Sequence, residues 1–226
     1  MQKTERKNGI IAGISLIIMA ISAGFAYGYA HNELVAESPE MTLQNLTANQ
    51  SLFFAELAGW SIIFITDLIV SIALYFFFRS ASKQISLVTA FIRIFYTLVL
   101  GVAIMQLFRI VPVLSSANPS ASEIASHFQL FEKLWSVGLI IFGLHLIGLG
   151  YLSVKSASVP KLLGYLLYFG GFSYTFLHSS RQLNLFDAGV INSIENILAL
   201  PMALAEMLLA FWLIYIGFRK PFARKI

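Results

Sequence analysis

No cysteine occurs among the 226 residues of this chain, and charged residues are scarce. The absence of cysteine excludes disulfide bonds, thiolate nucleophiles and cysteine-ligated metal sites. Only 12% of the residues are charged, about half of the roughly 25% typical of soluble proteins. Hydrophobic residues make up 58% of the chain. There is too little charge to cover a large water-facing surface, so the composition indicates a protein of the lipid bilayer.

Recognisable catalytic motifs are also missing. There is no GxSxG elbow for a serine nucleophile, no HExxH zinc motif and no glycine-rich phosphate loop. The four histidines show no metal-ligand spacing. We therefore expect no metal and no cofactor, and the sequence assigns no catalytic residue. The formal charge of +4 comes from short basic pieces between apolar runs, which fits membrane topology better than nucleic-acid binding.

Long apolar runs dominate what remains. Each is close to the roughly 20 residues that cross a hydrocarbon core, and none shows the alternating pattern of a barrel strand. Spans of this length in lipid must be helical so that the backbone bonds itself. The sequence thus predicts an all-α, polytopic membrane bundle, a single membrane domain over residues 1–226, with helices at residues 9–30, 52–78, 85–107, 134–154, 161–179 and 194–218.

The first apolar run needs a separate decision. MQKTERKNG followed by an apolar stretch and GYA at residues 28–30 resembles a cleavable secretory signal. The run from Ile10 to Ala30 is long for such a signal and long enough to span the bilayer. We therefore expect the segment to be retained as the first helix.

The distribution of Lys and Arg predicts the orientation. Eleven of these residues lie on one set of helix ends: Lys3, Arg6, Lys7, Arg79, Lys83, Lys155, Lys161, Arg219, Lys220, Arg224 and Lys225. The other set of ends carries only Arg109, Lys133 and Arg181. The positive-inside rule then places both termini in the cytoplasm. Two larger loops are expected outside, a polar one at 31–51 with a short surface helix and a turn-rich one at 108–127.

Polar side chains inside the spans are the most informative feature, because a charge at the centre of a membrane helix costs about 2.5–3.5 kcal/mol. Depth follows from the rise per residue, counted from the basic residue that closes each helix. Arg93 and His145 are then about 15 Å deep and Asp67 about 18 Å, while Tyr174 and Glu206 are about 20 Å deep. Five helices are thus predicted to place a polar group in one midplane layer, which suggests a shared ligand or proton site.

Helical spacing predicts further candidates nearer the outer side. Glu56 precedes Asp67 by eleven residues, and Glu195 precedes Glu206 by the same interval. Eleven residues are close to three full turns, so each pair lies on one helix face. His178 lies four residues after Tyr174. We take Glu56, Glu195 and His178 as secondary candidates on the outer side.

The midplane layer holds one arginine and two carboxyl groups. If Arg93 pairs with either Asp67 or Glu206, the other is buried without a cation, and burial then favours its protonated form. An intramembrane carboxyl of this kind is suited to a proton relay. The alternative interpretation is a structural ion pair that only fixes helix register. The sequence leaves the partner of Arg93 open.

Four stretches carry a family resemblance: AFIRIFYTLVLG at 90–101, FGLHLIGLGYL at 142–152, VPKLLGYLLYFGGFSY at 159–174 and AEMLLAFWLIYIG at 205–217. With the six-span layout they resemble the bacterial domain of unknown function 4386 family of integral membrane proteins. The resemblance implies a six-helix protein of a bacterial cytoplasmic membrane and implies no activity. Lys161 stands where related sequences commonly have Arg.

Three functions stay open. The first and favoured one is transport or binding of a small molecule or ion at a polar midplane site around Arg93. The second is an intramembrane enzyme acting on a lipid or apolar substrate, with His145 or a carboxylate as base and Tyr174 as acid. The third is a structural or partner subunit. The expected partners are the lipid bilayer and no nucleic acid, while a small-molecule ligand and a homo-oligomer are left open.

Overall fold

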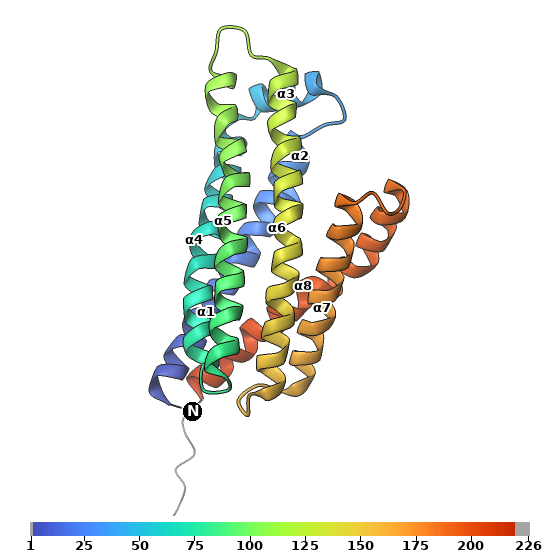
Figure 1. Ribbon diagram of the computed structural model, residues 1–226. Helices are drawn as coiled ribbons and strands as arrows, with labels where there is room; N and C mark the ends of the chain where they lie inside the picture. The colour runs from blue at the N-terminus through green and yellow to red at the C-terminus, as the bar shows by residue number, and fades with distance from the viewer. Residues whose placement is uncertain (1, 220–226) are drawn as a thin grey trace, which may run out of the picture.

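The chain folds into a bundle of long helices, shown in Figure 1 by a computed structural model that describes residues 2–219. Over this range the structure contains helices and no strand. The elements are α1 (Lys3–Phe25), the π-helix η1 (Ala26–His31), α2 (Asn32–Leu34), α3 (Pro39–Ala48), α4 (Gln50–Phe78), α5 (Lys83–Leu114), α6 (Ala121–Lys155), α7 (Lys161–Gln182) and α8 (Ala188–Phe218).

The helices alternate in direction between two ends of the bundle (Figure 1). We call one the basic end, because Lys3, Arg79, Lys83, Lys155 and Lys161 lie at its helix termini. We call the other the α3 end. The predicted basic residues Lys220, Arg224 and Lys225 lie outside the described residues.

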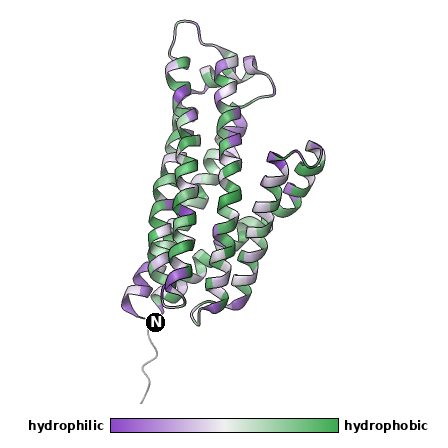
Figure 2. Cartoon of the chain, viewed as in Figure 1, coloured by the Kyte–Doolittle hydropathy of each residue, from purple (hydrophilic) through white to green (hydrophobic). Residues whose placement is uncertain are grey.

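Five helical segments are long and apolar enough to cross a membrane: Lys3–Leu34, Gln50–Phe78, Lys83–Leu114, Ala121–Lys155 and Gly189–Phe218. Figure 2 shows their mid-sections as mainly hydrophobic and their ends as more hydrophilic. The segment predicted at 161–179 forms α7, which is not one of these five because its second half contains Ser173, Thr175, His178, Ser179 and Arg181. Five spans are therefore supported by length and composition.

Two helices extend further than expected. The turn-rich loop predicted over 108–127 is shorter than expected and is confined to residues 115–120, because α5 continues to Leu114 and α6 begins at Ala121. Pro112 lies inside the last turns of α5, and the Ser120 hydroxyl caps α6 by accepting from the Glu123 backbone N–H. At 32 residues α5 is about 48 Å long, well beyond the roughly 30 Å of a hydrocarbon core. Hydropathy marks the edge of the lipid rather than the end of the helix.

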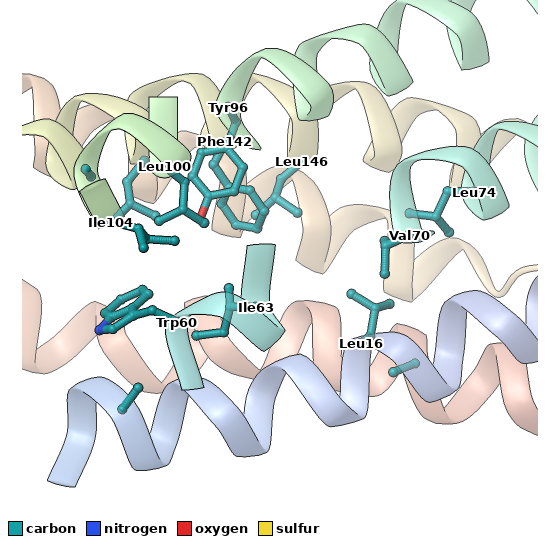
Figure 3. Close-up of a cluster of buried hydrophobic side chains, with 14 of the residues drawn as sticks. Leu16, Trp60, Ile63, Val70, Leu74, Tyr96, Leu100, Ile104, Phe142 and Leu146 are labelled. Carbon is teal, nitrogen blue, oxygen red and sulfur yellow. The ribbon is translucent and has the colours of Figure 1, made fainter. Parts of the chain in front are cut away.

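Most buried apolar side chains belong to one core formed by α1, α4, α5, α6 and α8. Figure 3 shows part of it, with Leu16 of α1, Trp60 and Ile63 of α4, Leu100 of α5 and Phe142 of α6. The α3-end halves of α7 and α8 have a separate small cluster of Leu177, Ile191 and Met202, with Tyr174, Ile194 and Leu198 against it. We call it the hairpin cluster. The α7–α8 hairpin is thus partly independent of the main core.

Glycines set the closest helix contacts. A Cβ on Gly143 of α6 would lie 2.6 Å from the Gly171 carbonyl oxygen of α7, and one on Gly13 of α1 would lie 2.7 Å from the Ala210 carbonyl oxygen of α8. Gly13 and Gly9 have the GxxxG spacing that is typical of close helix packing in membranes. The second such pair, Gly24 and Gly28, has nothing within 4 Å of a built Cβ.

A matched pair of substitutions tests these contacts. Gly143→Ala should destabilise the protein by about 1–3 kcal/mol, because backbone cannot move aside as a flexible side chain can. Gly24→Ala should be neutral or stabilising by up to about 1 kcal/mol, since alanine is the better helix former. Unfolding of the purified proteins in detergent measures both effects. Equal stability of the two variants would contradict the packing described here.

Candidate functional site

Arg93 lies at the centre of the bundle and is completely buried. Its Nε and Nη2 atoms lie 2.8 and 2.6 Å from Oδ1 of Asp67 on α4, and its Nη1 atom lies 2.8 Å from Oε1 of Glu206 on α8. Sequence left a choice between these two carboxyl groups, and the structure shows that Arg93 binds both. With His145 of α6 they form what we call the central cluster.

His145 completes the contacts of Arg93 in a defined protonation state. Its Nδ1 atom lies 3.0 Å from the Thr89 carbonyl oxygen, which can only accept a hydrogen bond, so Nδ1 carries a proton. Its Nε2 atom lies 3.1 Å from Nη1 of Arg93, which can only donate, so Nε2 carries none. His145 is therefore neutral, and both of its ring nitrogens are occupied.

Two apolar side chains also contact the guanidinium. Sδ of Met19 on α1 lies 3.6 Å from Nη2, and the Arg93 Cζ atom lies 5.3 Å from the centre of the Phe142 ring. Sequence reasoning missed both residues, because Met and Phe in an apolar helix are ordinary core residues and carry no signal of their own. Four helices, α1, α4, α6 and α8, thus supply groups to the guanidinium of one arginine on α5.

The central cluster carries one more acid than base. With His145 neutral, ionised Asp67 and Glu206 against Arg93 leave a formal charge of −1. Asp67 is fully buried, and its Oδ2 atom has no hydrogen-bond partner. Glu206 keeps 15% of its side chain exposed, whereas Arg93 and Asp67 are at 0%. The one accessible member of the cluster is therefore a carboxyl group.

Tyr174 does not join the predicted layer by a direct contact. Its ring lies edge-on to Phe142 at 5.3 Å between centroids and stacks on the His178 ring at 6.0 Å. Phe142 thus contacts both Tyr174 and Arg93. Depth was estimated from the sequence without the side-chain directions, which is why this residue was expected in the same site.

A second buried polar group lies nearer the α3 end. Glu56 is completely buried, and its Oε1 atom lies 2.8 Å from Nδ1 of His31 and 3.4 Å from Nε1 of Trp60. Nε2 of His31 lies 3.1 Å from Oε1 of Glu132 on α6. Glu56 is therefore held in a buried network. His31 and Glu132 were not selected from the sequence. His31 is the polar residue that ends the first apolar run, and this position is the signal that could have identified it.

A polar cavity of about 750 Å³ opens between η1, α6, α7 and α8. Its lining includes Tyr174, His178 and Glu195, three of the residues predicted from sequence. Glu195 forms an ion pair with Arg181, and Nδ1 of His178 lies 2.9 Å from the Ser136 hydroxyl. Glu132 also lines the cavity and so joins it to the His31 network.

The cavity approaches the central cluster without including it. Glu195, Ala199 and Met202 of α8 line it, and Glu206 follows Met202 by four residues on the same helix face. On α6, Leu139 lines the cavity and Phe142 follows by three residues. Apolar Leu139, Met202 and Phe142 therefore separate the cavity from Arg93 by about one helical turn, roughly 5 Å.

Comparison with known proteins assigns the chain to a family. The family described as "Domain of unknown function (DUF4386)" matches residues 11–217, a range that contains all four members of the central cluster. The chain belongs to this family. With its apolar helices, membership makes the chain an integral, multi-pass membrane protein in contact with the lipid bilayer.

Outside this family match, similarity to other proteins is distant. An uncharacterized protein of Archaeoglobus fulgidus is 28% identical over 161 residues, which cover 71% of this chain and 83% of that protein. That similarity extends the comparison to an archaeal protein. No solved structure matches the chain. Among residues 2–219, no group of three or more His, Cys, Asp or Glu side chains is placed to hold a metal ion.

Proposed function

We propose that this protein binds and transports a small molecule or ion, with the polar cavity as the binding site and the central cluster as a proton-exchange site. The observation that supports this most is the accessibility of Glu206. It lies one turn beyond the cavity on the same face of α8, and it alone of the ionised groups bound to Arg93 is partly exposed. A proton on Glu206 would remove the surplus negative charge of the cluster.

The proposed membrane topology has six spans and both termini in the cytoplasm. At 22 residues α7 is about 33 Å long, enough to cross a core of roughly 30 Å, and its polar half faces the cavity at Tyr174 and His178. The basic end would be cytoplasmic by the positive-inside rule. One membrane domain would then cover residues 1–226, in the cytoplasmic membrane of a bacterium. A homo-oligomer stays a prediction.

Transport or binding is favoured over the enzyme alternative by the state of His145. A general base needs a free ring nitrogen within reach of a substrate proton. Both nitrogens of His145 are occupied, and the ring contacts of Tyr174, the proposed acid, are with Phe142 and His178. His145 and Tyr174 therefore do not form a common site, which leaves a carboxylate as the base in the enzyme alternative.

Single-cysteine labelling tests the cavity, because the chain has no cysteine of its own. Ala199→Cys places a thiol in the cavity lining, and Ile197→Cys places one on the same helix at a position 73% exposed and outside the lining. A membrane-impermeant thiol reagent should label position 199 at least about tenfold faster, because only a hydrated thiol forms the reactive thiolate. Equal labelling rates would overturn the cavity as an aqueous site.

The same variants then test transport. Solutes that slow labelling of Ala199→Cys are added to liposomes that contain the protein and a trapped pH dye. A transported solute should move protons, and Glu206→Gln should abolish the dye response while leaving the protection at position 199 intact. A dye response unchanged by Glu206→Gln would show that the central cluster does not exchange the proton.

A further inference from the structure

Helices α1 and α8 are in close contact near the basic end and separate toward the α3 end. Near the basic end, Gly13 packs on Ala210 and Gly217 packs on Ile10, while Nε of Arg6 donates to the Gly217 carbonyl oxygen at 3.1 Å. The buried residues of α1 lie between Gly9 and Leu16, in its first half. Beyond them Ile21 is 68% exposed. The close contact of α1 with α8 is therefore confined to the basic end.

The other half of α8 packs mainly on α7. From Gly189 to Leu200 the only buried residue is Ile191, which belongs to the hairpin cluster. Leu200 is 67% exposed, and Pro201 follows it inside the helix. Proline removes one backbone hydrogen bond and favours a bend at this point. The hairpin cluster holds this half of α8 to α7, away from the main core.

The polar cavity lies where the helices separate. Its walls are Tyr27 of η1, one face of α6, and the inner faces of α7 and α8. Exposed apolar side chains flank the lining residues in the sequence, since Phe25 precedes Tyr27 by two residues and Leu200 follows Ala199. A polar site with an apolar border at the membrane matches a molecule that has a polar head and an apolar tail.

The lining also indicates the charge of the head group. The Tyr27 and Trp135 rings meet edge-on at 4.6 Å between centroids, and the 47% exposed carboxylate of Glu132 lies three residues before Trp135 on α6. Aromatic faces beside a carboxylate suit an ammonium group. Lys133 and Arg181 line the same cavity and suit an anionic group. The two acids and two bases, Glu132, Glu195, Lys133 and Arg181, balance in charge.

We propose that the cavity takes the head group of a zwitterionic amphiphile, which enters from the bilayer between α1 and α8 and keeps its tail in that opening. This inference rests on the proposed function, since it names the class of molecule that the cavity binds. The ammonium lies against Glu132, Tyr27 and Trp135, and the anionic group lies toward Lys133 and Arg181.

Binding of three probes tests the proposal by thermal stabilisation of the detergent-purified protein. Lysophosphatidylethanolamine carries a tail and a zwitterionic head, lysophosphatidylglycerol carries a tail and a net negative head, and phosphoethanolamine carries the head alone. The first should bind at least about tenfold more tightly than either of the others. Glu132→Gln should weaken it about tenfold, whereas Glu123→Gln, at an exposed site on the same helix, should not.

Each alternative result contradicts a different part of the proposal. Equal binding of phosphoethanolamine would contradict the role of the tail and the lateral entrance. Equal binding of lysophosphatidylglycerol would contradict the preference for a zwitterionic head group. Ala199→Trp fills the cavity from α8 and should also abolish binding. This variant tests the site independently if Glu132→Gln fails to fold. Retained binding in Ala199→Trp would show that the amphiphile binds elsewhere. If no probe binds while a soluble solute protects Ala199→Cys, this inference fails and the proposed function stands. If the thiol at position 199 is inaccessible, the proposed function itself fails.

Discussion

Arg93→Ala is expected to destabilise the protein by about 3–5 kcal/mol, one of the two largest effects expected of a single substitution in this chain. The variant leaves Asp67 and Glu206 buried beside each other with no cation, and it removes the donor to Nε2 of His145. Uncompensated charge in a low-dielectric interior costs more than the ion pair itself is worth. Unfolding of the detergent-purified protein measures the loss.

A neutral version of the cluster separates charge from packing. Arg93→Ala combined with Asp67→Asn and Glu206→Gln removes every charge, so most of the lost stability should return. Arg109→Ala, an exposed arginine on the same helix, is the control and should change stability by less than about 1 kcal/mol. If Arg93→Ala unfolds no more easily than Arg109→Ala, the central cluster does not hold the bundle together. If the neutral triple variant also transports normally, the structural interpretation is correct.

Asp67→Ala should cost about 3–5 kcal/mol, whereas Glu206→Ala should cost only about 1 kcal/mol. Both changes leave one carboxylate for Arg93, so formal charge alone predicts no difference. The contacts differ, because Oδ1 of Asp67 accepts from both Nε and Nη2, and without it Nη2 is left with only the weak acceptor Sδ of Met19. Without Glu206, Nη1 still has His145.

Denaturant or thermal unfolding of the two variants side by side measures this asymmetry. Equal losses would mean that the two carboxyl groups share the arginine evenly and that the fully buried position of Asp67 adds nothing. A larger loss for Glu206→Ala would reverse the roles assigned here. In that case Asp67, with its unpartnered Oδ2 atom, would be the candidate for the exchangeable proton.

The long helices and most of the central cluster were predictable from the sequence. Apolar length fixes how many segments can span, and a count of residues from a charged helix end fixes depth, since an α-helix rises uniformly. This is why Arg93, Asp67, His145 and Glu206 were expected at one level, and the structure joins all four.

The direction in which a side chain points depends on how the helices tilt and rotate against each other. A single sequence does not contain information on this relative tilt and rotation. Tyr174 was predicted in the same layer as Arg93, but it lines the cavity and contacts Phe142 instead of the arginine. The network of His31, Glu56 and Glu132 was missed for the same reason, since it joins η1, α4 and α6 through their packing. The cavity arises because the α7–α8 hairpin has its own cluster of apolar side chains, which hydropathy does not distinguish from the main core.

Proton exchange at the central cluster requires that its surplus carboxyl group binds a proton. Infrared difference spectroscopy between neutral and alkaline pH detects a protonated carboxyl by its carbonyl stretch. The spectrum should show one protonated carboxyl group of the cluster that is lost on alkalinisation, and the band should vanish in the Asp67→Asn, Glu206→Gln double variant and persist in Glu195→Gln. Absence of any such band in the folded wild-type protein, or a band that persists in the double variant, would contradict proton exchange at this cluster.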